Sequence, residues 1–164
     1  MLTLGIDPGT ATTGYGLVRE NPDSSLVAVD YGVITTSAGT PMPQRLRILY
    51  QRLSEIIDLH RPQNGAVEKL YFHRNVTTAI SVGQGRGVVI LALAQAELAV
   101  GEYTPLQVKQ AVAGYGGADK NQVQQMVRAL LGLDEVPRPD DAADALAVAI
   151  CHIHSTGRDR LTEI

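Results

Sequence analysis

Four carboxylates occur where the sequence pattern would bring them to one edge of a sheet. Asp7 follows the alternating apolar residues of 2–6, and Glu68 follows a second short apolar run. Asp141 and Asp144 are three residues apart, a spacing that puts two side chains on one face of a helix. Clustered carboxylates repel one another unless a cation neutralises them, and hard divalent ions prefer oxygen ligands. The pattern therefore indicates a site for Mg²⁺ or Mn²⁺, and two such ions can promote phosphodiester hydrolysis.

Each carboxylate also has a structural interpretation, which is weaker for Asp144 and for Glu68 because both belong to apolar stretches. Asp7 begins an Asp-Pro-Gly turn, and either Asp140 or Asp141 could simply cap the last helix. Asp144 lies in an otherwise apolar stretch, where an unpaired charge would be costly. We favour a shared metal site because it explains the four carboxylates together.

Strands and helices alternate along the chain and must position these residues. In the third expected strand, Val27, Val29, Tyr31 and Val33 should share one face. The order of elements implies an α/β sheet with an antiparallel hairpin on one side. The expected strands are 2–7, 14–18, 26–36, 65–68 and 100–104. The first expected helices are 44–60 and 76–99, and a third starts at Thr104-Pro105. Two more follow, one over 120–131 after an Asp119 cap and one from Asp140 or Asp141 to about His154.

Residues 76–99 are apolar and rich in alanine and glycine. Gly83, Gly85 and Gly87 alternate there, and each glycine weakens a helix by about 1 kcal/mol relative to alanine. Their spacing does not match the GxGxxG pattern of a phosphate-binding loop. We expect a helix that packs closely on the sheet or on a second subunit, because such packing could offset the cost of the glycines.

The length and composition are typical of a single domain. A chain of 164 residues can bury one sizeable core. No window of about 18 uninterrupted apolar residues occurs, so no membrane span is expected, and the N-terminus lacks the pattern of a secretion signal. Cys151 is the only cysteine, which excludes an internal disulfide and fits a reducing cytoplasm.

The charge is unevenly distributed along the chain. The net charge is −3, but residues 45–128 carry +4 while residues 1–44 carry −3 and residues 129–164 carry −4. A basic middle segment can bind a polyanion even when the total charge is negative. A solvated surface of uneven charge is the alternative.

Several different short motifs are distributed over nearly the whole chain. They are Gly5-Ile-Asp-Pro-Gly-Thr10 with Gly14-Tyr-Gly16, Ala66-Val-Glu68, Gly83-Gln-Gly-Arg-Gly-Val88, Gln107-Val-Lys-Gln110, Lys120-Asn-Gln-Val-Gln124 and Asp141-Ala-Ala-Asp-Ala-Leu-Ala147. Together these motifs resemble the RuvC family of Holliday-junction resolvases, the crossover junction endodeoxyribonucleases of the ribonuclease H-like superfamily.

The resemblance implies one ribonuclease H-like nuclease domain over residues 1–164. Its α/β fold would be a mixed five-stranded sheet, with the first three strands antiparallel and helices on both faces. The activity would be Mg²⁺-dependent, with Mn²⁺ as a substitute and two ions per site, and a homodimer would nick a four-way DNA junction symmetrically in recombination and repair. A branch-migration helicase would be its partner. The catalytic and metal-binding residues would be Asp7, Glu68, Asp141 and Asp144.

The resemblance also implies DNA contacts, and the chain departs from the family near some of them. Lys69 follows the catalytic glutamate where glutamine is more usual, and Asp140 adds an acid before Asp141. Two aromatic residues stand where the family has one that stacks on a base near the crossover, so the resemblance does not decide which of the two rings stacks. The expected DNA-binding residues are Tyr71, Phe72, Arg74, Lys109 and Lys120.

Three alternatives remain at this point. One is a ribonuclease H-like nuclease that acts on structured RNA. A second is an actin-like or sugar-kinase-like nucleotide binder, since Asp7-Pro-Gly-Thr10 after a first strand also occurs in that superfamily. A third is a junction-binding subunit without catalytic activity.

Overall fold

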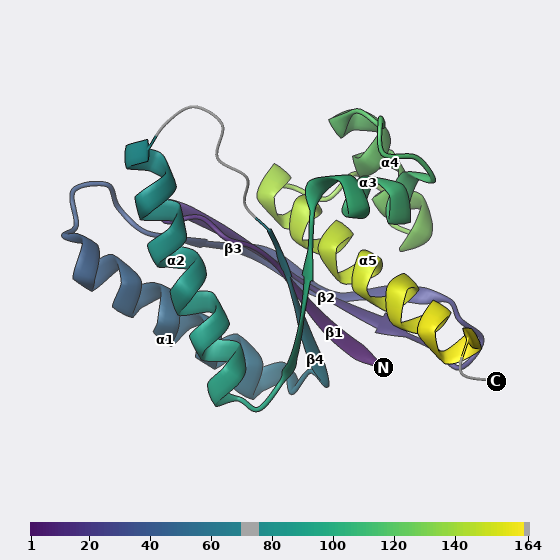
Figure 1. Ribbon diagram of the computed structural model, residues 1–164, viewed down its shortest axis with the longest axis horizontal. Helices are drawn as coiled ribbons and strands as arrows, with labels where there is room; N and C mark the ends of the chain where they lie inside the picture. Colours follow the sequence, from purple (N-terminus) through teal and green to yellow (C-terminus); the bar gives the residue numbers. More distant parts are fainter. Residues whose placement is uncertain (70–75, 163–164) are drawn as a thin grey trace.

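The chain folds into a five-stranded sheet with helices on both faces (Figure 1). The computed structural model describes residues 1–69 and 76–162, so the predicted DNA contacts Tyr71, Phe72 and Arg74 lie outside the described residues. The elements in chain order are β1 (Leu2–Asp7), β2 (Thr12–Glu20), β3 (Leu26–Thr35), α1 (Met42–His60), β4 (Asn64–Glu68), α2 (Val76–Gln95), β5 (Ala99–Tyr103), α3 (Pro105–Ala113), α4 (Lys120–Leu130) and α5 (Asp140–Thr162).

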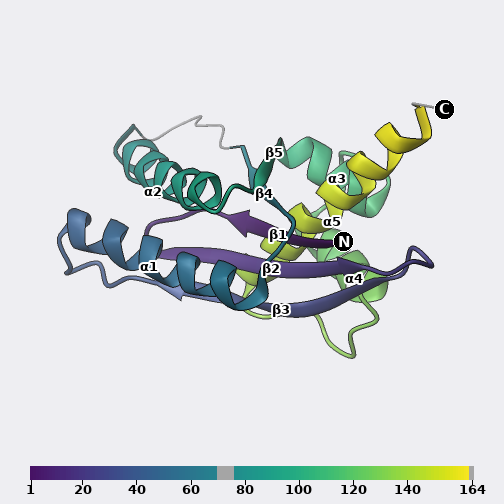
Figure 2. The same cartoon turned by 90° about the horizontal axis from the view of Figure 1, so that it is seen from below.

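The strands are arranged across the sheet in the order β3-β2-β1-β4-β5 (Figure 2). β1 pairs with β2 and β2 with β3 in antiparallel fashion, whereas β4 and β5 continue the sheet in parallel with β1. Parallel neighbours need a crossover, which α1 and α2 provide. β1 and β4 therefore end at the same edge. This arrangement confirms the expected mixed sheet whose first three strands are antiparallel.

Two apolar cores hold the helices to the two faces of the sheet. The core under α1 and α2 contains Leu2, Leu4 and Ile6, so the predicted apolar face of β1 is confirmed. The core under α3, α4 and α5 is supplied largely by α5, in which every residue of 142–153 except Asp144 is buried. Burying one large aliphatic side chain contributes about 1.5–3 kcal/mol. The first half of α5 is therefore held firmly against the sheet.

β3 departs from the predicted pattern. Val29 packs into the core under α1, whereas Tyr31 packs against the core under α5, and Val27 is exposed. The register with β2 shifts between Leu17 and Val18, which leaves Val29 opposite no residue. Such a β-bulge adds one residue to a strand and reverses the alternation of faces beyond it. The prediction of one shared apolar face was therefore wrong.

Two predicted helix starts agree closely with the structure, whereas the predicted ends of α2 and α5 do not. Thr104 and Asp119 each form a capping box, with the cap side chain accepting a hydrogen bond from the backbone of Gln107 and Gln122, respectively. The helix expected over 76–99 ends earlier, at Gln95, and α5 continues past the expected end to Thr162. Caps have a side-chain signature, whereas these two ends carry no proline to stop the helix.

Helix α2 packs on the sheet with one side and exposes the other. A Cβ on Gly85 would lie 3.0 Å from the carbonyl oxygen of Gly9, in the turn after β1. A Cβ on Gly83 or Gly87 would meet no atom within 4 Å. The close packing expected of the three glycines is therefore present at Gly85 and absent within the described chain at the other two.

By length and composition alone, α2 could cross a membrane, contrary to the expectation that no segment would. The helix has 20 residues and reaches a mean hydropathy of 1.4, with 22% of the hydropathy window buried. One such helix is weak evidence, because core helices of water-soluble proteins meet the same criterion. In this fold, α2 is the crossover between β4 and β5 and packs beside α1. Its exposed apolar side needs another explanation.

Candidate active site

Helix α5 lies directly on the N-terminal strands because glycines leave room for it. A Cβ on Gly14 of β2 would overlap the carbonyl oxygen of Asp141, and one on Gly5 of β1 would overlap that of Ala145. Only glycine permits so close an approach of two backbones. The first turn of α5 is therefore placed beside the end of β1, where Asp7 lies.

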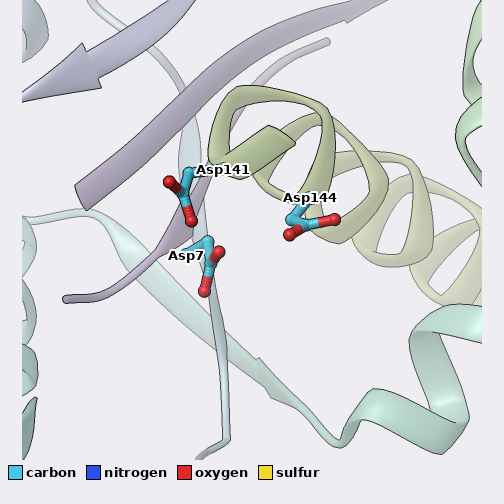
Figure 3. A group of neighbouring side chains, drawn as sticks. All are labelled: Asp7, Asp141 and Asp144. Atoms are coloured by element: carbon cyan, nitrogen blue, oxygen red, sulfur yellow. The ribbon is translucent and has the colours of Figure 1, made fainter. Parts of the chain in front are cut away.

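Three of the predicted carboxylates converge at this point (Figure 3). Asp7, Asp141 and Asp144 each offer one carboxylate oxygen, and these atoms all lie within 4.8 Å of one another. All three residues are partly exposed, so solvent and ions can reach them. Oxygen ligands lie about 2.0–2.6 Å from Mg²⁺ or Ca²⁺ in proteins, so one ion could contact donors at these separations.

Glu68 faces the same site from the neighbouring strand. It lies outside the group that the three aspartates form, but it is close enough for its charge to raise the pKa of Asp7. A pocket of about 260 Å³ opens between Glu68 and Asp144. The pocket walls also include Pro105, Val108, Lys109, Lys120, Val123 and Ala147.

Burial and mutual repulsion make Asp7, Glu68 and Asp144 difficult to ionise. Burial, followed by the charges of Glu68 and Asp144, raises the pKa of Asp7 to about 8. Burial and the charge of Asp144 raise the pKa of Glu68 to about 7. Burial also raises the pKa of Asp144, against the opposing effect of Lys120. A divalent cation would relieve this repulsion, and the oxygen-only donor set suits a hard ion.

Two predicted lysines border the acidic site. Lys109 of α3 lines the pocket, and its charge partly offsets the rise in the pKa of Glu68. Lys120, the first residue of α4, places its Nζ 3.5 Å from Oδ2 of Asp144. Partial burial lowers the pKa of Lys120, but the charges of Asp144 and Asp140 outweigh that effect and raise it. Both lysines therefore carry positive charge beside the pocket.

The structure separates the roles of the two adjacent aspartates at the start of α5. Asp141 belongs to the carboxylate group, whereas Asp140 points to Lys120 and Arg138. Gln124 also contacts Asp140. The contacts of Arg138 and Gln124 with Asp140 are not predicted from the sequence. Gln124 lies four residues after Lys120, on the same face of α4, which is the only sequence signal for this contact.

A mixed sheet that gathers carboxylates at the end of its central strand, beside lysines and an open pocket, defines a class: metal-dependent nucleases of the ribonuclease H-like fold. Within that class, the chain belongs to the RuvC family, because the family model described as "Crossover junction endodeoxyribonuclease RuvC" matches residues 3–152. The crossover junction endodeoxyribonuclease RuvC of Desulfitobacterium hafniense is 65% identical over 155 residues, covering 94% of this chain and 93% of that protein. The protein of the same name from Chloroflexus aurantiacus is 61% identical, covering 94% of each chain.

Solved structures agree with this assignment. The structure of Thermus thermophilus RuvC matches with a TM-score of 0.90 and 38% identity over 97% of both chains. T. thermophilus RuvC in complex with Holliday junction substrate matches with a TM-score of 0.89 and 36% identity over 96% of both chains. A yeast mitochondrial Holliday junction resolvase, at 12% identity and a TM-score of 0.72 over 95% of this chain and 79% of that one, shares the fold.

These matches decide between the alternatives. They favour a junction endonuclease over a nuclease for structured RNA and over an actin-like nucleotide binder. The family description also names an enzyme rather than a binding subunit. The ribonuclease H-like fold and the family membership that the sequence motifs imply are both confirmed.

Proposed function

We propose that this chain resolves four-way DNA junctions in recombination and repair, by symmetric nicks made through Mg²⁺-dependent phosphodiester hydrolysis. The convergence of Asp7, Asp141 and Asp144 at the end of β1, in a chain of this family, carries the proposal. The likeness to RuvC in complex with Holliday junction substrate supports the choice of substrate. Residues 1–164 would form a single nuclease domain.

The metal ions would be held by Asp7, Glu68, Asp141 and Asp144. Mg²⁺ is the natural ion for such donors, Mn²⁺ would substitute, and we propose two ions per site. When bound, the ions activate water and stabilise the leaving oxygen. The carboxylates come from two strand ends and one helix, and two of them, Glu68 and Asp144, line the pocket. Because the pKa values of Asp7 and Glu68 are raised, ion binding would release protons from these two carboxyl groups.

Lys109 and Lys120 would face the phosphate backbone of the DNA. Both line the pocket next to the carboxylates, where a scissile phosphate would bring further negative charge. Their ammonium groups would offset that charge and hold the strand in place, because phosphate contacts fix the position of a nucleic acid. These two residues would bind and orient the substrate without exchanging protons with it.

Tyr71, Phe72 and Arg74 remain proposed DNA contacts on sequence grounds. They follow Glu68 closely in the chain but lie outside the described residues. Stacking of an aromatic ring on an unpaired base contributes about 1–3 kcal/mol. Comparison of Tyr71→Ala with Phe72→Ala would show which ring stacks. The variant that lacks the stacking ring should cleave a junction more slowly while its unfolding free energy stays nearly unchanged.

We propose a homodimer that forms through the exposed side of α2. Val76, Ile80 and Leu91 are 76%, 60% and 51% exposed along that side. Gly83 and Gly87 lie between them and face open space. Apolar residues spaced by one helical turn around small residues favour close contact between two helices. A second copy of the chain would cover this stripe, and two active sites could then act on one symmetric junction.

The dimer proposal predicts the effect of a charge on the stripe. Leu91→Glu should shift the mass measured by light scattering from dimer to monomer, because it places an unpaired carboxylate in an apolar interface. Leu59→Glu is a matched control, since Leu59 is 76% exposed on α1. Equal masses for Leu91→Glu and the unaltered chain would contradict the proposed interface.

A branch-migration helicase and a cytoplasmic location complete the proposal. Both come from the family resemblance, and the single cysteine is consistent with a reducing compartment. Co-purification of the chain with a helicase from the same cell, in the presence of a four-way junction, would test the partner.

Cleavage of a synthetic four-way junction tests the main proposal. The same strands should be offered as a junction, as linear duplexes and as structured RNA, with Mg²⁺ or with EDTA. We expect paired nicks at symmetric positions in the junction with Mg²⁺ alone. Equal cleavage of duplex DNA, or preferential cleavage of RNA, would contradict the proposal.

A further inference from the structure

Lys120 is shared between a carboxylate of the acidic site and one outside it. Its Nζ lies 3.4 Å from Oδ2 of Asp140 and 3.5 Å from Oδ2 of Asp144. Asp144 belongs to the carboxylate group that would hold metal, whereas Asp140 does not. One lysine therefore connects the site to a second anchor at its edge.

Asp140 is itself held in place by two further residues. Arg138 donates a hydrogen bond from Nη1 to Oδ1 of Asp140 at 2.6 Å. Gln124 of α4, which is buried, also hydrogen-bonds Asp140. Because Arg138 occupies Oδ1, the other oxygen of the carboxylate remains directed at Lys120. Each oxygen of the Asp140 carboxylate therefore has a cationic partner of its own, Arg138 at Oδ1 and Lys120 at Oδ2.

We propose that Asp140 is a positioning residue that keeps Lys120 at the edge of the site when a divalent ion is bound. The inference rests on the proposed function. The ammonium group of Lys120 would be repelled by a cation held at Asp144 and would leave that carboxylate. A released lysine would regain the freedom of its long side chain and lose its fixed direction. Asp140 retains one N–H of the ammonium and leaves the others for a phosphate oxygen.

This role predicts an effect opposite in sign to that of a simple surface charge. Removal of a negative charge beside DNA normally tightens binding, because repulsion of the phosphates falls. If Asp140 positions Lys120, Asp140→Asn weakens binding instead. Asparagine keeps the size of the side chain and an oxygen that can accept hydrogen bonds from Arg138 and Gln124. The start of α5 should therefore remain folded in this variant.

The test is a cycle of four proteins: the unaltered chain, Asp140→Asn, Lys120→Gln and the double variant. Affinity for a synthetic four-way junction is measured over a series of salt concentrations with Ca²⁺ in place of Mg²⁺, and a gel shows that the junction stays uncut. We expect Asp140→Asn to weaken binding about three- to tenfold and to lower the salt slope by about one phosphate contact. In the Lys120→Gln background, the same change should tighten binding or leave it unaltered.

Asp134→Asn serves as the matched control, because it removes the same charge from an exposed position in the loop before α5. It should leave the affinity equal or slightly tighter. Tighter binding by Asp140→Asn in the unaltered background would overturn the inference, and so would equal weakening in both backgrounds. If the unaltered chain failed to bind the junction at all, the proposed function would be contradicted and the inference with it.

Discussion

Two pockets of similar size lie on opposite faces of the sheet and use their carboxylates differently. One, of about 260 Å³, holds Glu68 and Asp144 under α3 and α4. The other, of about 240 Å³, lies between α1 and β3 and holds Asp30 and Glu55. Both contain two acidic and two basic side chains, so a count of charged residues does not distinguish them.

The partners of the carboxylates do distinguish the two pockets. Asp30 accepts a hydrogen bond from the backbone N–H of Tyr31 and lies 3.0 Å from Nε2 of His60. Glu55 pairs with Arg52 at 3.0 Å. In the acidic site, by contrast, the carboxylates face one another, and repulsion adds to burial in raising their pKa values. The carboxylates of the pocket near α1 have their own hydrogen-bond or ion-pair partners. The carboxylates of the acidic site repel one another, so a bound cation would stabilise them.

Among the substitutions considered, Asp7→Asn should have the largest effect, and the effect should be on catalysis in the acidic site. The amide binds a divalent ion poorly, so we expect single-turnover cleavage of a four-way junction to fall by ~10³-fold. Junction affinity should change little, because phosphate contacts rather than the metal hold the DNA. Gel-based cleavage and binding assays check both expectations. Cleavage at the unaltered rate would exclude Asp7 from the metal site.

The stability of the metal-free chain should fall as pH rises. The ordinary pKa of Asp7 is 3.8 and its folded value is about 8, so between these values the folded state keeps a proton that the unfolded state has lost. Glu68 acts likewise between 4.5 and about 7. The unfolding midpoint should therefore decline from pH 5 to pH 8, and Mg²⁺ should raise it more at pH 8 than at pH 6.

Asp7→Asn provides the control for this pH dependence. Without the titrating carboxyl, the metal-free variant should be more stable than the unaltered chain at pH 8, by on the order of 1 kcal/mol. Calorimetry in EDTA at several pH values measures the difference. A decline of the same size in both proteins would show that Asp7 does not cause it.

Lys109→Ala should sharpen the comparison by removing a cation from the acidic pocket. We expect the slope of log affinity against log salt for junction binding to fall by about one phosphate contact. Arg47→Ala, an exposed cation on α1 on the opposite face, should leave the slope unchanged. If both variants changed the slope equally, Lys109 would have no specific place on the DNA.

Asp30→Asn should have the smallest effect and should be confined to stability. The loss of the Asp30–His60 pair should cost about 0.5–1 kcal/mol of unfolding free energy, because both side chains are partly exposed. Junction cleavage and the stabilisation by Mg²⁺ should not change. A loss of cleavage without unfolding would show that the two pockets are coupled.

The sequence predicts the convergence of Asp7, Asp141 and Asp144 because the ends of elements place these residues. Asp7 and Glu68 close two strands that must run in parallel, and the spacing of Asp141 and Asp144 gives their common face. The bulge at Val29 was not predictable from alternation, because one extra residue changes only the pairing with β2.

Other features depend on contacts distant in the sequence. The sharing of Lys120 between Asp140 and Asp144 requires α4 and α5 to be placed in three dimensions. The apolar composition of α2 indicated burial, but it could not show that Ile80 and Leu91 face outward. Composition reports how apolar a helix is, whereas only the fold reports what covers each side.

The close contact of α5 with β2 has a consequence for mutational surveys of this chain. Gly14 carries no functional group, but any side chain there would push against the backbone of Asp141 and wedge the helix away from the strand. Even alanine, the mildest replacement, should therefore inactivate the chain as completely as loss of a charged residue. A screen that judged importance by chemical reactivity would overlook position 14, where the absence of a methyl group lets the carboxylates of β1 and α5 come together.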